Sequence, residues 1–263
     1  MNKLQITIVL GLLIVVGTAF SRTVTKEFDK TVDLAANGAV NVKNVNGKIC
    51  VESWDKDKVH INAVIEVKSS SSQRAEEFIE QVEIKVEKNG DELYIQPEHP
   101  KARGEDFFKM LLGSRNPSVQ VDFTIKVPRN AQVDLNSVNG SIEILALKGL
   151  AKLQTVNGKI TAQEMHSAVD AGTTNGGIQI EINESNISDD MRLHTVNGSI
   201  SITMPKTTAA DLSMSTVNGS IHTDFPLQLE GMWSNKNVDG KINGGGKKIS
   251  LGTVNGSISI YEK

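Results

Sequence analysis

Hydrophobic and polar residues alternate along two stretches of the chain, strictly in the second and with Val64 as an exception in the first. In residues 59–67 and 119–127 every second position is apolar, which is the period of a β-strand with one buried face. A helical period occurs once, where Ala75, Phe78, Ile79 and Val82 are spaced near 3.6 residues and predict a short helix at about 73–82. The pattern therefore predicts a β-rich N-terminal half with one helix.

A β-hairpin is predicted directly after this helix. The strand-like segments 83–87 and 93–96 flank Asn89-Gly90. Asn-Gly between two strands is the strongest short signal for a two-residue turn.

The five-residue phrase Val-Asn-Gly-Ser-Ile, or a close variant, organises the rest of the chain. Its eight copies begin at Val45, Val138, Val156, Thr174, Val196, Val217, Val238 and Val254. From the second copy onward, successive Asn or Asp positions are 16–22 residues apart. No helical period occurs between them, so the spacing predicts a β-repeat architecture.

Two architectures fit the phrase. In the first, each Asn-Gly closes a hairpin, and a row of hairpins builds a propeller, prism or sandwich. In the second, each repeat is one coil of a β-solenoid and Asn-Gly forms the same corner in every coil. The solenoid is favoured because Val, Asn, Gly and Ile recur together, and because one repeat has too little apolar surface to be stable without neighbours.

The solenoid assigns each residue of the phrase a structural role. Stacked coils would place the Asn side chains about 4.8 Å apart, where their amides can form a hydrogen-bonded ladder. The glycine is expected to supply a positive φ, and columns of Val and Ile are expected to fill the core. The predicted corner residues are Asn46, Gly47, Asn139, Gly140, Asn157, Gly158, Asn175, Gly176, Asn197, Gly198, Asn218, Gly219, Asp239, Gly240, Asn255 and Gly256.

Three features together resemble a known family. They are the segment 46–55 (Asn-Gly-Lys-Ile-Cys-Val-Glu-Ser-Trp-Asp), the strand ending at Val127-Pro128, and the serial Asn-Gly-x-Ile phrases. Over residues 24–263 the chain resembles the DUF4097/DUF2807 group of proposed adhesins, which are exported bacterial β-strand-repeat proteins. The resemblance implies a single-stranded, right-handed β-helix at the cell envelope, and it transfers no catalytic residues.

The domain organisation follows from these patterns. Residues 1–21 are expected to be a signal peptide, with Lys3 before the apolar run 6–16 and cleavage after Ala19 or Ser21; an uncleaved anchor is the alternative. Residues 22–137 are expected to form an N-terminal β region with an irregular, flexible loop at about 99–117. Residues 138–263 are expected to be β-helix repeats that continue this region as one solenoid domain.

Composition excludes several classes of partner. The formal net charge is −3 and aromatic residues make up 4%, so the chain lacks the basic face that nucleic-acid binding requires. No apolar stretch after the predicted signal peptide is long enough to span a membrane. A single cysteine, Cys50, cannot close an internal disulfide, and its strand-like context predicts a small buried residue.

The sequence contains no established catalytic, cofactor or metal motif. The five histidines lack metal-ligand spacing, although His194 and His222 could approach one another on neighbouring coils. The segment 244–248 (Gly-Gly-Gly-Lys-Lys) lacks the order of a phosphate-binding loop and is expected to be a flexible loop. If the chain were a polysaccharide-cleaving β-helix, its carboxylates would be Asp170, Glu181, Glu184, Asp189 and Asp190.

These observations favour a non-enzymatic, exported β-helix without a cofactor. It would act as an adhesin-like or structural surface at the cell envelope, and its partner would be a cell-surface glycan or an envelope protein. The alternatives are a carbohydrate-active β-helix enzyme of the lyase or hydrolase kind and a periplasmic scaffold for a protein partner. The scaffold alternative rests on the apolar patch 107–112 in the predicted loop.

Overall fold

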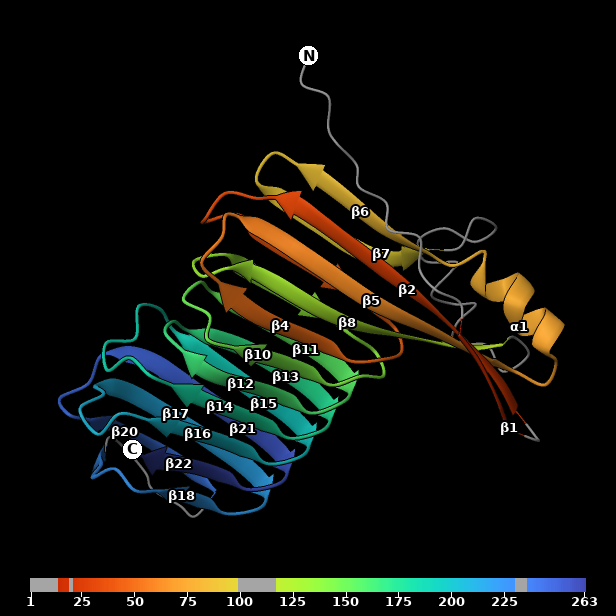
Figure 1. Cartoon of the computed structure of the whole chain (residues 1–263). Coiled ribbons are helices and arrows are strands. Elements are labelled where there is room, and N and C mark those ends of the chain that lie inside the picture. Colours follow the sequence, from red (N-terminus) through yellow and green to blue (C-terminus); the bar gives the residue numbers. More distant parts are fainter. Residues whose placement is uncertain (1–13, 19–20, 99–116, 230–235) are drawn as a thin grey trace.

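Two eleven-stranded β-sheets form the body of the molecule (Figure 1). The computed structural model describes residues 14–18, 21–98, 117–229 and 236–263, with side chains from residue 23 onward. The first sheet has the order β1 (Ile14–Thr18), β2 (Ser21–Asp33), β5 (Lys58–Ser69), β8 (Ser118–Pro128), β4 (Ile49–Trp54), β10 (Ile142–Leu145), β12 (Ile160–Met165), β14 (Ile178–Ile182), β16 (Ile200–Met204), β22 (Ile258–Glu262) and β18 (Ile221–Thr223). The second has the order β19 (Gln228–Leu229), β20 (Asn237–Ile242), β17 (Ala210–Asn218), β21 (Lys247–Asn255), β15 (Met191–Asn197), β13 (Val169–Asn175), β11 (Ala151–Asn157), β9 (Gln132–Asn136), β3 (Ala39–Lys43), β7 (Glu92–Glu98) and β6 (Glu83–Asn89).

Each coil consists of a strand in the second sheet, an Asn-Gly corner and a strand in the first sheet. Equivalent strands of neighbouring coils pair in parallel and in register, so that Ile160 lies between Ile142 and Ile178. An Asn-Gly hairpin would instead have paired the two flanking strands with each other in antiparallel fashion. The predicted β-solenoid is therefore confirmed, and the row of hairpins is wrong.

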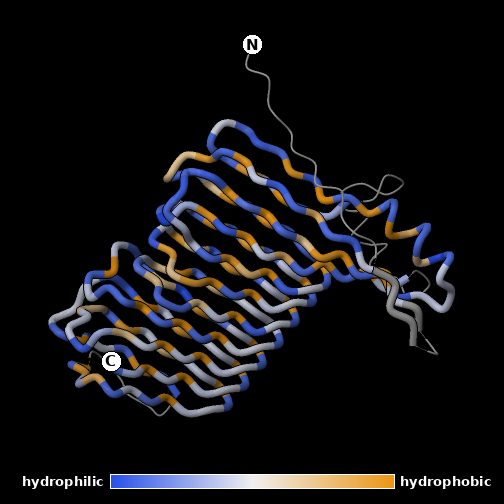
Figure 2. Tube along the Cα trace, in the orientation of Figure 1, coloured by the Kyte–Doolittle hydropathy of each residue, from blue (hydrophilic) through white to orange (hydrophobic). Residues whose placement is uncertain are grey.

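The hydrophobic core lies between the two sheets. Alternate residues of every coil point inward, and hydrophobic and polar positions alternate along the coils (Figure 2). The isoleucine of the phrase is at most 1% exposed at Ile49, Ile142, Ile160, Ile178, Ile200 and Ile258. Such columns explain why a coil is stable only against its neighbours.

The last coil in the sequence is not the last coil in the stack. The strand β21 lies between β15 and β17, and β22 lies between β16 and β18. The chain builds the coil of β17 and β18 first, crosses its outer side through β19 and β20, and then returns to fill the gap. The C-terminal coil thus joins the terminal coil to the rest of the solenoid.

The N-terminal part extends the first sheet with longer antiparallel strands. The strands β2, β5 and β8 pair with one another and extend beyond the stack toward α1 (Ser72–Ile79) (Figure 1). The helix contacts β2 and β5 and buries Ala75 and Ile79, as its spacing predicted. It ends three residues earlier than expected because Gln81 and Val82 form tighter turns with Phe78 and Ile79.

The predicted hairpin is confirmed, but its two turn residues are Gly90 and Asp91, because Asn89 still pairs with Glu92. The strands β6 and β7 pair in antiparallel fashion, and Gly90 has the positive φ (61°) that this turn needs. The predicted loop lies outside the described residues except for Pro117, and its patch 107–112 lies wholly outside them. The strand β1 falls within the predicted signal peptide, whose removal stays a prediction.

Candidate functional site

The corner asparagines form a continuous amide ladder along one edge of the solenoid. Each Nδ2 donates to the Oδ1 of the next asparagine, from Asn139 to Asn46 at 2.9 Å, and at 2.8 Å from Asn157 to Asn139, Asn175 to Asn157, Asn197 to Asn175, Asn255 to Asn197 and Asn218 to Asn255. The N-terminal end is closed by Val119, whose carbonyl oxygen accepts from Asn46 Nδ2 at 3.0 Å. The ladder is exposed, so each bond is expected to contribute toward the lower end of about 0.5–1.5 kcal/mol.

Most corner glycines are required because the next coil lies very close to them, and not because of a positive φ as predicted. Only Gly47 has a positive φ (114°), and the prediction is wrong for the other corners. A Cβ added at Gly198 would lie 1.9 Å from the carbonyl oxygen of Gly176 in the next coil. The glycines at 140, 158, 176, 219 and 256 have the same contact at 1.8–2.1 Å. Glycine is thus needed because the coil backbones approach too closely for any side chain.

A buried threonine column, which the sequence patterns did not reveal, supports these corners from inside. Two residues before the asparagine, a threonine donates its hydroxyl to the corner glycine carbonyl of the adjacent coil. The bonds run from Thr155 to Gly140 (3.0 Å), Thr173 to Gly158 (3.1 Å), Thr195 to Gly176, Thr253 to Gly198 and Thr216 to Gly256 (all 2.9 Å). The sequence signal for this column was the threonine that recurs directly before Val-Asn-Gly.

Two predictions about the phrase are wrong. Asp239 and Gly240 do not form a corner, since they lie within β20 and pair with Ser213 and Leu212 of β17. The valine of the phrase does not fill the core of the repeats either, because it follows the buried threonine and points outward. Val156, Val196, Val217 and Val254 are 39–54% exposed, while Val45 alone among the valine positions of the corners is fully buried.

The carboxylates proposed for an enzyme do not form a facing pair. Glu181 binds Lys263 (2.8 Å), Glu184 binds His166 (2.7 Å), Asp189 accepts from Ser188 Oγ (2.9 Å), and Asp190 accepts from the Lys248 backbone nitrogen (2.9 Å). Asp170 lies on the other sheet, in register with Lys152 and Arg192. Four of the five carboxylates that a glycoside hydrolase could use thus already have polar partners, and the fifth lies in the other sheet.

The described histidines and the glycine-rich segment 244–248 do not form a metal or phosphate site either. His194 and His222 lie in different sheets and do not approach one another. Within the described residues, no cluster of His, Cys, Asp and Glu could hold a metal ion. The Gly244–Gly246 turn packs against Asp211, whose carboxylate accepts from the Gly246 backbone nitrogen at 3.3 Å, so a negative charge already occupies this loop.

Cys50 is half-buried on the outer side of β4, contrary to the predicted core position. Its Sγ lies 3.8 Å from Glu143 Oε2, which binds Lys48 Nζ at 2.7 Å. Burial raises the pKa of the Cys50 thiol, and the hydrogen bond to Glu143 raises the pKa of Lys48. A raised pKa leaves less of the thiol in the nucleophilic thiolate form, so nothing in this cluster activates Cys50.

The edge opposite the corners is irregular, and we call it the loop edge. The connections there vary in length, from 166–168 to 183–190, whereas the corners are constant (Figure 1). This difference explains why successive corner asparagines from Asn139 to Asn218 are 18–22 residues apart. In solenoids, insertions of this kind gather on one face, which is often the binding face.

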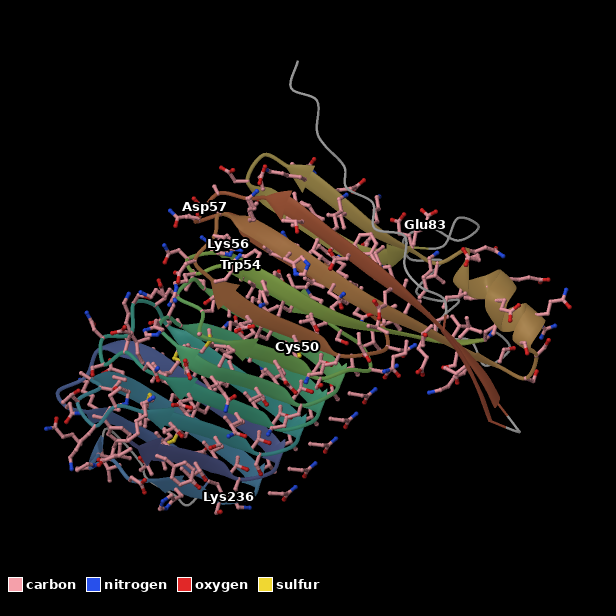
Figure 3. The ribbon with its side chains drawn as sticks, in the orientation of Figure 1. Cys50, Trp54, Lys56, Asp57, Glu83 and Lys236 are labelled. Carbon is pink, nitrogen blue, oxygen red and sulfur yellow. The ribbon has the colours of Figure 1, made fainter. Side chains whose placement is uncertain are left out.

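A hollow on the loop edge surrounds Trp54. It measures about 290 Å³ and is lined by Ala36, Trp54, Asp55, Lys56, Asp57, Pro128, Arg129, Asn130 and Lys148. Figure 3 shows Trp54, Lys56 and Asp57 together at this edge, while Cys50 lies nearer the corners. The hollow thus combines one large aromatic side chain with several charged groups from three turns.

Local contacts hold the Trp54 hollow in shape. The indole Nε1 donates to the Lys58 carbonyl at 2.8 Å, and Lys56 Nζ lies 4.7 Å from the ring centroid. Arg129 binds Asp55 through two nitrogens, and this pairing lowers the pKa of the Asp55 carboxyl.

A second hollow of about 770 Å³ lies further along the loop edge. It is lined by Ser185, Asn186, Ile187, Ser188, Thr207, Ala209 and the segment 245–247, so polar and apolar residues are mixed in its wall. It contains no aromatic side chain.

Comparison with known proteins identifies the family. A model of the Toastrack family DUF4097 matches residues 23–261. The chain belongs to this family. No curated protein matches the chain.

Among solved structures, similarity to this Toastrack chain extends over most of its length at low sequence identity. A proposed cell adhesion protein from Clostridium sporogenes is 14% identical with a TM-score of 0.49, covering 91% of this chain and 100% of that one. A proposed adhesin from Bacteroides fragilis is 10% identical with a TM-score of 0.39, covering 89% and 97%. These values are too low to carry an argument about function. Within the described part of this Toastrack chain, no helix has the length and apolarity of a membrane span.

Proposed function

We propose that this Toastrack protein is a non-enzymatic, exported binding protein that presents an adhesin-like surface at the cell envelope. The binding face is the loop edge, and its contact point is the Trp54 hollow. Export rests on the signal-peptide pattern of residues 1–21. The Trp54 hollow is the observation that carries the proposal.

The corner edge is unsuited to recognition because its polar groups already bind one another. The amide nitrogens of the ladder are paired from Asn46 to Asn218 and the amide oxygens from Asn46 to Asn255, and the corner carbonyls accept from the threonine column. The loop edge instead offers charged side chains around an aromatic ring. Variation between coils is also confined to this edge, as expected for a face that acquires ligand specificity.

The chemistry of the hollow fits a surface glycan. A sugar ring could pack on the indole by displacing Lys56 Nζ, which lies 4.7 Å from the ring centroid. Asp57, Asn130 and Lys148 provide hydrogen-bonding groups in the lining of the hollow. The hollow is too small and too open to enclose a large ligand. It therefore suits one sugar unit of a longer chain.

Separation of the carboxylates disfavours the enzyme alternative. Glu181, Glu184, Asp189 and Asp190 are each engaged by a different partner, and Asp170 lies in the other sheet. The protein-scaffold alternative rests on the patch 107–112, which lies outside the described residues and stays a prediction. Deleting residues 101–115 and repeating a pull-down from envelope extracts tests it.

Trp54→Ala should weaken glycan binding by about 30-fold or more, since removing a central tryptophan from an interface costs roughly 2 kcal/mol or more. The measurement is binding of the purified protein lacking residues 1–21 to cell-wall fractions and to a glycan array. Sugar release is assayed in the same samples.

Tyr94→Ala is the matched control, because Tyr94 is an exposed aromatic (39%) on β7, away from the hollow. The proposal predicts that Tyr94→Ala binds as the parent does. Equal binding by the parent and Trp54→Ala would remove the hollow from the binding site. Sugar release by the parent would establish the enzyme alternative.

A further inference from the structure

Three corners have the same six-residue sequence, Thr-Val-Asn-Gly-Ser-Ile. They begin at Thr195, Thr216 and Thr253. Their strands β15, β21 and β17 are consecutive in the second sheet, and the corner of β17 ends the ladder. Any difference in reactivity between these asparagines must therefore come from the structure, because their immediate sequence is the same.

Asn-Gly is a chemically labile pair. The backbone nitrogen of the glycine can attack the side-chain carbonyl carbon of the asparagine, because glycine places no side chain in the way and allows the required backbone rotation. A carbon–nitrogen bond forms, ammonia leaves, and a five-membered succinimide results. Water then opens the succinimide at one of its two carbonyls and gives aspartate or isoaspartate.

Inside the ladder both reacting groups are restrained. Asn197 donates to Asn175 and accepts from Asn255, each at 2.8 Å, so its side chain is held at both ends. The Gly198 nitrogen, which would be the nucleophile, donates to the Asn255 carbonyl at 3.0 Å. Asn255 is restrained in the same way, by Asn197, Asn218 and the bond from Gly256 N to Asn218 O (3.1 Å).

Asn218 lacks most of these restraints. Its Nδ2 donates to Asn255, but among the described residues nothing donates to its Oδ1 and nothing accepts from the Gly219 nitrogen. Gly219 is exposed, whereas Gly198 and Gly256 are half-buried. Val217 is 54% exposed, compared with 39% for Val196 and for Val254.

From these contacts we infer that Asn218-Gly219 is a spontaneous deamidation site, and that the interior corners of the ladder are protected from the same reaction. The reaction needs only water and releases ammonia, so no enzyme or cofactor is involved. Its rate is set by the position of the corner in the stack.

Conversion of Asn218 would loosen the terminal coil. Aspartate at this position loses the donor to Asn255 and places a carboxylate against the Asn255 Oδ1, so that two acceptors face each other. Isoaspartate in addition inserts a backbone carbon into a corner where Gly219 already approaches the Gly256 carbonyl closely. The neighbouring edge strand β18 would then separate more readily from β22.

The test follows aspartate and isoaspartate at each corner by peptide mass spectrometry during incubation of the folded full chain at mildly alkaline pH. Conversion at Asn218 should exceed conversion at Asn197 and Asn255 by a wide margin. In urea-unfolded protein the three identical hexapeptides should convert at similar rates, since only the fold distinguishes them. Similar rates at the three corners of the folded protein would overturn the inference, and so would an unreactive Asn218 in the folded chain.

Asn218→Gln is the matched variant, because glutamine keeps the amide but forms the corresponding ring far more slowly. Amide hydrogen exchange in β18 should rise with incubation time in the parent and stay constant in this variant. If exchange in β18 rises equally in both proteins, deamidation at Asn218 is not what loosens the coil.

Discussion

Gly198→Ala should lower the free energy of unfolding by more than about 3 kcal/mol, because overpacking against a backbone that cannot yield is among the costly core changes. The added Cβ would lie 1.9 Å from the Gly176 carbonyl oxygen and 2.5 Å from its carbon. The two coils must then separate, which weakens the ladder bond between Asn197 and Asn175 and the hydroxyl bond from Thr195. Thermal unfolding should show a decrease on the order of 10 °C.

Gly252→Ala is the matched control in the adjacent strand β21. No atom lies within 4 Å of a Cβ at this position, and the backbone has no positive φ. The variant should be neutral or slightly more stable, by up to about 1 kcal/mol, because alanine reduces the entropy of the unfolded chain. Equal stability of Gly198→Ala and the parent would mean that the coils do not approach as closely as the structure shows.

Deleting residues 247–263 should release β17, β18 and β20 from the solenoid while the coils from β3 to β16 stay folded. The deletion removes four side chains that are at most 3% exposed: Ile249, Leu251, Ile258 and Ile260. At about 1.5–3 kcal/mol each, their burial contributes roughly 6–12 kcal/mol, which is comparable to the whole stability of a typical domain. Hydrogen exchange should therefore become fast in β17, β18 and β20, while the coils from β3 to β14 stay protected.

A synthetic peptide of residues 247–263 provides the control. Added to the truncated protein, it should fill the gap between β15 and β17 and restore protection in β17 and β18. Protection that persists in these strands without the peptide would mean that the terminal coil can dock directly on β15.

Local signals in the sequence were enough to predict the coil. The alternating stretches became β5 and β8, and the segments beside Asn89-Gly90 became a hairpin whose turn is Gly90-Asp91, because each depends on neighbouring residues. The recurring Val-Asn-Gly-Ser-Ile phrase predicted a stacked corner because identical residues gain most when they lie above one another. The asparagine ladder and the isoleucine column followed from that stacking.

The order of the coils could not be predicted, because identical corners fit one another in any order. Asn255 donates to Asn197 and accepts from Asn218. Asn218 carries the same groups and could donate to Asn197 directly, so the corner sequence does not say which coil comes next. The phrase can also occur outside a corner. Asp239 matches it but lies in β20, which pairs with β17 in antiparallel fashion. The phrase describes local geometry and leaves long-range pairing open.

The Trp54 hollow was also beyond sequence reasoning. Its lining comes from three separate turns, near Ala36, Trp54 and Arg129, with Lys148 from a fourth segment. Only the stacking of coils brings these turns to one edge. Tryptophan at the end of a strand is in itself no signal for a binding site.

Engineered cysteine pairs test the central claim, that the repeated phrases form one stack with the C-terminal coil inserted. In a Cys50→Ser background, Ser220→Cys with Ser257→Cys should form a disulfide, because the two hydroxyls lie 3.1 Å apart on adjacent coils. Ser199→Cys with Ser220→Cys should not, because one coil separates them and two strand spacings, about 9.6 Å, exceed the reach of a disulfide. Efficient cross-linking of 220 with 257 and none of 199 with 220 is the predicted result. Cross-linking of 199 with 220 in the folded protein would contradict the inserted coil.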